Sequence, residues 1–192
     1  MSIHLDQLLD LAVQNPKSLA AEIVKLSNVD RRTLLNHAAS GESSRRLAAA
    51  YAKHGSGKVS ILSLEKGVAT FHARTSLPAV PAFDFHFFKD AHGNVWGRTE
   101  ISVATFLGPG YFGVTEGKEL RNELTLDFDR VPPADAVPKG WPPVQSNASA
   151  LSAMLFQGVS IRVRGSAGGL LTGSVWRNGR DQGTFVNLVR AA

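Results

Sequence analysis

The chain contains no cysteine and little of several other residue types. Its 192 residues include two methionines and two tyrosines, and 19% of them are charged. Without cysteine there can be no disulfides, thiolate metal sites or cysteine nucleophiles. No stretch approaches the roughly 18 continuous apolar residues of a membrane-spanning helix. The first residues also lack the basic and apolar regions of a secretory signal, so we expect a cytoplasmic protein without an integral membrane segment.

A concentrated stretch of like charge is also missing. Lys and Arg number 21 against 16 Asp and Glu, for a formal net charge of +5, and the charges are dispersed along the chain. Nucleic-acid binding needs a basic stripe, so we expect no nucleic-acid partner. The pairs Arg31-Arg32 and Arg45-Arg46 fall in expected helices, where a solvated face is the ordinary interpretation. Peripheral contact with a membrane and the oligomeric state stay open.

Residues 1–54 show the apolar spacing of four short helices. Asn28 or Asp30 is expected to cap the third of them. Helices of this length are not stable alone in water, so they must pack on one another or on the rest of the chain. We therefore divide the chain into a helical segment, 1–56, and a second domain, 57–192.

From Val59 onward the apolar residues recur with period two, the spacing of half-buried strands. Eighteen glycines and nine prolines supply the turns between them. Many short strands with regular turn signals and no alternation with helices are typical of an antiparallel barrel or sandwich. The expected strands are 59–64, 68–74, 82–88, 95–101, 111–115, 120–130, 159–164, 170–176 and 184–190.

The last expected hairpin carries a family resemblance, in the segment Arg180-Asp181-Gln182-Gly183-Thr184-Phe185-Val186-Asn187-Leu188-Val189. This segment resembles the closing strand of the plastid-lipid-associated, fibrillin-type family. Proteins of that family are similar to lipocalins, β-barrels thought to hold lipophilic molecules. The resemblance identifies no binding residue. Together with the strand pattern, it implies an α+β protein whose short N-terminal helices precede, or pack against, a lipocalin-like antiparallel β-barrel of about eight or nine strands.

The best-specified strand is Phe83-Asp84-Phe85-His86-Phe87, in which aromatic and polar residues alternate. Asp84 and His86 share one face, about 7 Å apart by strand geometry. A histidine and a carboxylate can act as an acid–base pair, and two histidines with a carboxylate can bind a transition metal. Alternating polar residues also commonly just face water. Our candidate catalytic residues are His86 and Asp84, and we predict no metal and no cofactor.

The other polar residues that can contribute chemistry fall into two groups. His72, His92 and Glu100 can join the pair above. A second set would form cross-strand ion pairs or, inside a barrel, line a pocket; paired carboxylates are also used by glycosidases, though here without a supporting motif. The members of this set are Glu123, Asp127, Asp129, Arg162 and Arg164.

The aromatic residues are the candidate ligand-binding set. We expect the phenylalanines to point into the barrel, where they would line a cavity or fill it, and Trp141 to plug the core. The candidate ligand-binding residues are Phe71, Phe83, Phe85, Phe87, Phe106, Phe112, Phe128 and Trp141.

These patterns support one leading function and two alternatives. The first is non-catalytic binding or carriage of an apolar or amphipathic small molecule, such as a lipid or isoprenoid, because barrels of about eight strands can hold one small ligand. The second is a barrel enzyme (isomerase, cyclase or hydrolase), which requires His86 and Asp84 to point into an enclosed pocket. The third is a protein-interaction module that docks through the basic helices of residues 30–54.

Overall fold

A computed structural model describes most of the chain. The described residues are 7–8, 11, 16–39, 62, 64, 67–77, 80, 82–101, 108–117, 123–148, 150–167 and 169–191. The expected fourth helix with Arg45 and Arg46, the boundary at residue 56 and the candidate Phe106 lie outside them.

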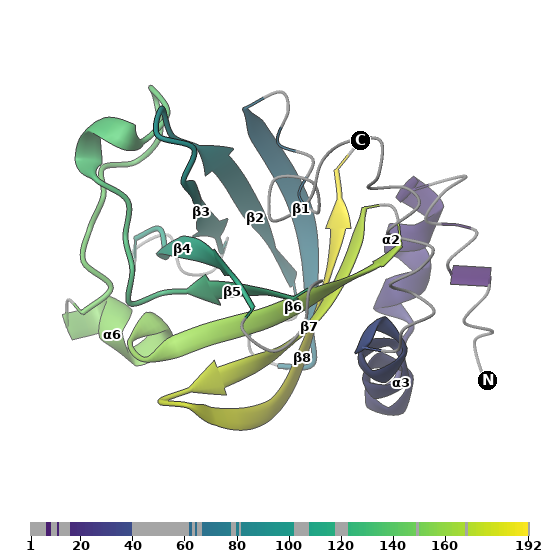
Figure 1. Cartoon of the computed structure of the whole chain (residues 1–192). Helices are drawn as coiled ribbons and strands as arrows, with labels where there is room; N and C mark the ends of the chain where they lie inside the picture. The colour runs from purple at the N-terminus through teal and green to yellow at the C-terminus, as the bar shows by residue number, and fades with distance from the viewer. Residues whose placement is uncertain are drawn as a thin grey trace.

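The described part of the chain forms a closed barrel of eight antiparallel strands (Figure 1). Each strand pairs with its neighbour in sequence, and the last strand closes on the first, with Phe71 opposite Arg190. The expected antiparallel barrel is confirmed. The strands are β1 (Val68–Thr75), β2 (Ala82–Lys89), β3 (Val95–Glu100), β4 (Tyr111–Glu116), β5 (Glu123–Asp127), β6 (Val159–Ala167), β7 (Leu170–Arg177) and β8 (Arg180–Arg190).

Phenylalanines from β1, β2 and β4 fill one part of the barrel interior. Phe71, Phe85, Phe87 and Phe112 are all fully buried. The Phe87 ring meets those of Phe71 and Phe112 edge to face, at centroid distances of 5.4 and 5.5 Å. Such pairs add about 0.5–1.5 kcal/mol each to the stability gained by burial. The expected inward orientation of these phenylalanines is confirmed.

A glycine makes room for this aromatic packing. Gly97 lies opposite Phe112 in the β3–β4 register. A Cβ atom on Gly97 would collide with the Phe112 ring and come within 2.9 Å of the His86 carbonyl oxygen. The β3 backbone can therefore support the large Phe112 ring only because residue 97 has no side chain.

One end of the barrel is closed by Leu62 and Leu64, both fully buried in the same core. The Arg190 guanidinium donates to the Leu62 carbonyl oxygen at 2.7 Å, which places these leucines where β8 ends. Both residues are helical in conformation, so the expected strand over 59–64 is wrong at these two positions. These two apolar residues therefore close the end of the barrel, and they are not the inward-facing positions of a strand.

Two N-terminal helices, α2 (Pro16–Val24) and α3 (Asn28–Ala39), pack on the outside of the barrel near its last strands (Figure 1). Leu19, Ile23 and Leu34 form a second buried cluster with Leu170 of β7 and Val189 of β8. These short helices gain their stability from this shared apolar contact. None of the described helices is long and apolar enough to cross a membrane.

The cap of α3 differs from the prediction. Ser27 occupies the capping position, and its hydroxyl accepts a hydrogen bond from the Asp30 amide at 3.2 Å. The Asp30 carboxylate accepts in return from the Ser27 amide at 3.1 Å. This reciprocal capping box replaces the expected cap by Asn28 or Asp30.

Arg31 is buried beneath α3, so its predicted solvated position is wrong. Its guanidinium donates to the carbonyl oxygens of Leu26 at 3.3 Å and Arg74 at 3.4 Å. Burial, with a smaller contribution from the nearby charge of Arg74, lowers the pKa of Arg31. The neighbouring Arg32 is exposed, as expected. The difference arises because α3 turns the Arg31 side of its surface toward the barrel.

A long connection between β5 and β6 runs over the outside of the barrel. It contains a short 3-10 helix, η3 (Ala134–Ala136), and ends in α6 (Ala150–Phe156). Asn147 ties the connection down, since its side-chain amide donates to the carbonyl oxygens of Tyr111 and Phe128, both at 2.6 Å. The Tyr111 hydroxyl donates to the Pro142 carbonyl oxygen at 2.6 Å. This connection carries Trp141 and positions α6.

Candidate functional site

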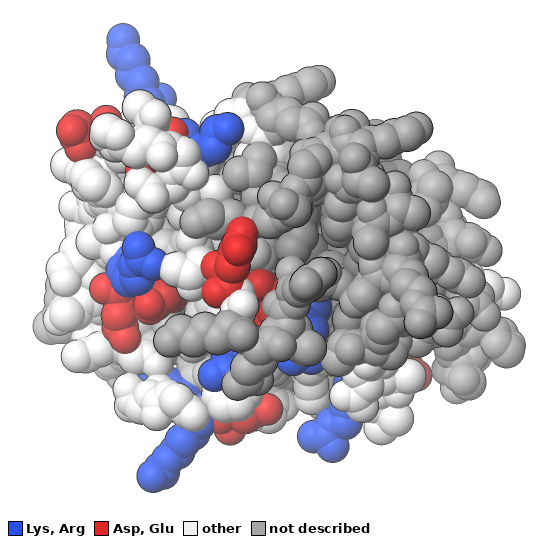
Figure 2. All heavy atoms as spheres, viewed as in Figure 1, with Lys and Arg blue, Asp and Glu red and all other residues white. Residues whose placement is uncertain are grey.

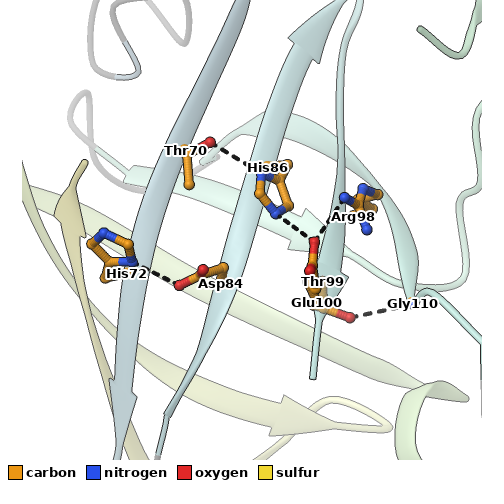
Figure 3. Close-up of polar contacts among 8 residues, drawn as sticks. All are labelled: Thr70, His72, Asp84, His86, Arg98, Thr99, Glu100 and Gly110. Carbon is orange, nitrogen blue, oxygen red and sulfur yellow. Dashed lines mark hydrogen bonds and ion pairs between the residues drawn. The ribbon is translucent and has the colours of Figure 1, made fainter. Parts of the chain in front are cut away.

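The polar side chains of β1, β2 and β3 form two hydrogen-bonded groups on the outer face of the barrel, together called the outer array (Figure 3). His72 and Asp84 are joined at 2.8 Å. His86 contacts the Thr70 hydroxyl through Nδ1 at 3.0 Å and the Glu100 carboxylate through Nε2 at 3.1 Å. Glu100 also accepts from Arg98 at 2.8 Å. The array comprises Thr70, His72, Asp84, His86, Arg98 and Glu100.

The candidate catalytic residues Asp84 and His86 are not partners of each other in this array. Side chains two positions apart on a strand point in parallel, so each bonds across to a neighbouring strand. His72 is opposite Asp84 in the register, which explains the pair that does form. Neither Asp84 nor His86 lines the barrel interior, so the enclosed acid–base pocket required by the enzyme hypothesis is not formed by them. Within the described residues, no three His, Asp or Glu side chains converge as a metal site would need.

Trp141 lies over the outer array and not in the core, so its predicted role as a core plug is wrong. The Arg98 guanidinium stacks over the Trp141 ring at 4.8 Å from its centroid. Phe88 and His86 meet the same ring edge to face, at 5.2 and 5.9 Å. Trp141 thus covers the outward-facing Phe88 and partly buries His86.

Burial, together with neighbouring charges, shifts the pKa values of His86 and Glu100 in the outer array. It lowers the pKa of His86, and the Arg98 charge adds to this, against the opposing pull of Glu100 and Asp84. Burial alone would raise the pKa of Glu100, but the hydrogen bond and charge of Arg98, helped by His86, hold it below its usual value. A carboxylate can only accept, so Nε2 of neutral His86 carries the proton and Nδ1 accepts from Thr70.

Replacing His86 by glutamine is expected to flatten the pH dependence of stability between about pH 7 and 5. The unfolded chain binds a proton to this histidine near pH 6.5, above the lowered folded pKa. The stabilisation is therefore complete above pH 6.5 and is lost as the pH falls toward the folded pKa, by at most about 1.4 kcal/mol per pH unit. Urea denaturation at several pH values measures this, with the exposed His72→Gln as control. An unchanged slope in His86→Gln would contradict it.

The barrel interior contains a cavity of about 400 Å³ at the end opposite the Leu62 and Leu64 plug. Its wall is mostly aliphatic and aromatic, and it is built by the cavity-facing ends of β1, β2, β3, β6, β7 and β8 together with α6. The lining residues are Thr75, Leu77, Val80, Phe83, Thr99, Ile101, Phe128, Met154, Leu155, Phe156, Val159, Ile161, Val175, Arg177, Gln182, Thr184 and Val186.

The phenylalanines of the candidate ligand set separate into two groups. Phe83 and Phe128 line the cavity. The others in the described residues, Phe71, Phe85, Phe87 and Phe112, belong to the packed core instead. Trp141 is outside the barrel. The barrel is therefore filled at one end and hollow at the other.

Sequence reasoning missed most of the cavity wall, which comes from α6 and the last three strands. Inward positions there are aliphatic or small, as at Ile161, Val175 and Thr184, whereas β1, β2 and β4 place phenylalanines inward. Smaller side chains leave more space inside a closed barrel. That difference in size along the chain was the available signal.

Arg177 and two exposed apolar residues form the cavity rim. Met154 is 73% exposed and Leu77 43% exposed, and both line the cavity. Arg177 donates from Nη2 to the Met154 carbonyl oxygen at 2.6 Å and from Nε to the Gln157 carbonyl oxygen at 3.3 Å. These bonds attach the C-terminal end of α6 to the end of β7.

The second charged set lies on the outer face of β5 and β6. Glu123 is buried and pairs with Arg164 at 2.8 Å, directly opposite it in the register. This confirms one expected cross-strand pair.

The remaining members of this set have local roles. Arg162 stacks over the Trp176 ring at 3.9 Å from its centroid. Asp127 accepts from the Asp129 amide at 3.0 Å, and Asp129 accepts from the Gly158 amide at 2.9 Å. The two aspartates hold turns, so they do not form a pair of facing carboxylates.

On the face shown in Figure 2, acidic and basic side chains are interspersed over the described surface.

No protein-family model matches the chain, and no curated protein and no solved structure matches it either.

Proposed function

We propose that this protein binds one apolar or amphipathic small molecule, such as a lipid or isoprenoid, in the barrel cavity and does not act on it chemically. The observation that carries the proposal is the cavity of about 400 Å³, within the range of sites that enclose one small ligand. The resemblance of residues 180–189 to the fibrillin-type family favours the same class of ligand.

The chemistry of the wall supports an apolar ligand. Phe83, Phe128 and Ile161 offer carbon surface. The hydroxyl of Thr75 donates to the Val80 carbonyl oxygen at 2.7 Å, and that of Thr99 accepts from the Gly110 amide at 3.3 Å. These two polar groups already have protein partners. A wall of this kind gains more from contact with a hydrocarbon than from contact with water.

Filling the cavity is expected to abolish binding without unfolding the protein. Val175 faces the cavity and is only partly buried, so a phenylalanine there would extend into the ligand space. We expect Val175→Phe to weaken binding of a fluorescent fatty acid at least about tenfold, because the added ring and the ligand compete for one volume. Titration of probe fluorescence measures the affinity.

Val68→Phe is the matched control, because it makes the same substitution at an exposed position, at the end of β1 that is far from the cavity. It should leave the affinity unchanged. Mass spectrometry of the native protein, with extraction of co-purifying molecules, provides a second measurement. Equal binding by Val175→Phe and the unaltered protein, with no co-purifying lipid, would refute the proposed function.

A further inference from the structure

We propose that Arg177 selects a ligand with an anionic head group, held at the rim while its apolar chain fills the cavity. This inference rests on the proposed function and specifies its ligand class. Arg177 ends β7, lines the cavity and is half-buried. It is the only Lys or Arg among the described residues that line the cavity.

The guanidinium of Arg177 is held in place without being neutralised. Its Nε and Nη2 bond main-chain carbonyl oxygens of Ala153, Met154 and Gln157. Within the described part of the chain, no carboxylate pairs with it and no partner engages its Nη1. By contrast, Arg98 and Arg164 are each paired with a glutamate. Arg177 therefore presents a fixed positive charge with N–H donors to spare.

The surroundings of Arg177 suit an amphiphile. Arg180 lies opposite Arg177 across the β7–β8 hairpin and adds a second positive charge nearby. Further into the cavity the wall is apolar, at Ile161, Phe128 and Val186. An anion bonded by the guanidinium would gain a charge-assisted hydrogen bond, which is about twice as strong as a neutral one. A side chain already fixed by three carbonyl contacts loses little additional freedom on binding.

The test compares three unbranched ligands that have twelve carbon atoms each and different head groups: dodecanoate, dodecanol and dodecyl phosphate. The unaltered protein should bind dodecanoate or dodecyl phosphate about tenfold more tightly than dodecanol at pH 7. The anion that binds more tightly then identifies the preferred head group as carboxylate or phosphate. Arg177→Gln should reduce the preference for the anion to within about twofold while keeping the affinity for dodecanol. Arg177→Lys should retain part of the preference.

Arg180→Gln is the matched control, since it removes a positive charge from the same hairpin at an exposed position outside the cavity wall. It should retain most of the preference. Equal affinity of the unaltered protein for all three ligands would overturn this inference and leave the proposed function standing. Binding of none of them would refute the proposed function itself. If Arg180→Gln lost as much of the preference for the anion as Arg177→Gln, the rim would attract anions in general, and a specific role of Arg177 would be contradicted. If Arg177→Gln fails to fold, Arg180→Gln still decides between the two charges, because Arg177 is the only Lys or Arg among the described residues that line the cavity.

Discussion

Replacing Phe87 by alanine is expected to lower the free energy of unfolding by about 3–5 kcal/mol, the range for deleting a buried aromatic side chain. The Phe87 ring is fully buried. It contacts three other rings, those of Phe71, Phe85 and Phe112. Rings on three strands meet there, so no single neighbour can move to fill the space. Urea denaturation gives the free energy, and an unchanged slope with denaturant shows that the folded state is still the same barrel.

Phe83→Ala is the informative comparison, because Phe83 is on the same strand with the same side chain. Phe83 is only partly buried and lines the cavity, so its removal should cost less, about 1–2 kcal/mol. Phe83→Ala should instead alter the affinity for the fatty-acid probe, which Phe87→Ala should leave nearly unchanged. Equal losses of stability would contradict the division of the barrel into a filled and a hollow end.

The barrel was predictable because a strand's alternation is local. The sequence 83–87 determines by itself that three phenylalanines lie on one face and that Asp84 and His86 lie on the other. The interior of a closed barrel excludes water along every strand, so the apolar set goes inside. The pairing of Glu123 with Arg164 was expected on the condition that their strands are neighbours, and β5 and β6 meet that condition.

The errors arose where a residue's environment is set by distant parts of the chain. Trp141 is apolar enough to seek burial, but the outer faces of β2 and β3 offer Phe88 and Arg98 as its partners. Arg31 is in a helix segment whose charged residues are typical of a solvated face, yet its guanidinium donates to the carbonyl oxygens of Leu26 and Arg74. Neither of these contacts leaves a periodic pattern in the sequence.

The cavity was the hardest feature to predict in detail. Its wall combines Phe83 from β2 with Met154 from α6 and Thr184 from β8, residues that are far apart in the chain. Whether a barrel is hollow depends on the sum of side-chain volumes at one level along its axis. That sum needs the register of all eight strands, which single-sequence patterns do not provide.

The hairpin between β2 and β3 depends on one buried carboxylate, that of Asp90. Its Oδ1 accepts from the amides of His92 and Asn94, at 2.9 and 2.8 Å. Its Oδ2 accepts from the Asn94 side chain at 3.0 Å and from the indole of Trp96 at 2.9 Å. The carboxylate therefore organises the turn and also satisfies the buried Trp96 N–H.

Asp90→Ala is expected to lower the free energy of unfolding by about 2–4 kcal/mol, because four hydrogen bonds to a charged acceptor are lost and the Trp96 donor is left buried without a partner. Asp90→Asn should lose less stability, because its amide oxygen can replace Oδ1 as an acceptor. Some loss should remain, because its NH₂ group would face the two donors that Oδ2 accepts from. Urea denaturation measures both variants. A cost below about 1 kcal/mol for the alanine variant would mean that the turn forms without the carboxylate.

Acid should affect the unaltered protein through this same residue. Burial alone would raise the pKa of Asp90, but the hydrogen bonds from Trp96, Asn94 and the His92 amide outweigh it and lower the pKa. The resulting stabilisation is complete above the unfolded value of about 3.9 and is lost as the pH falls through the lower folded pKa. Asp90→Asn has no proton to gain there, so its stability should fall less steeply below about pH 4. Parallel pH profiles for the two proteins would show that other carboxylates, and not Asp90, determine the acid sensitivity of the barrel.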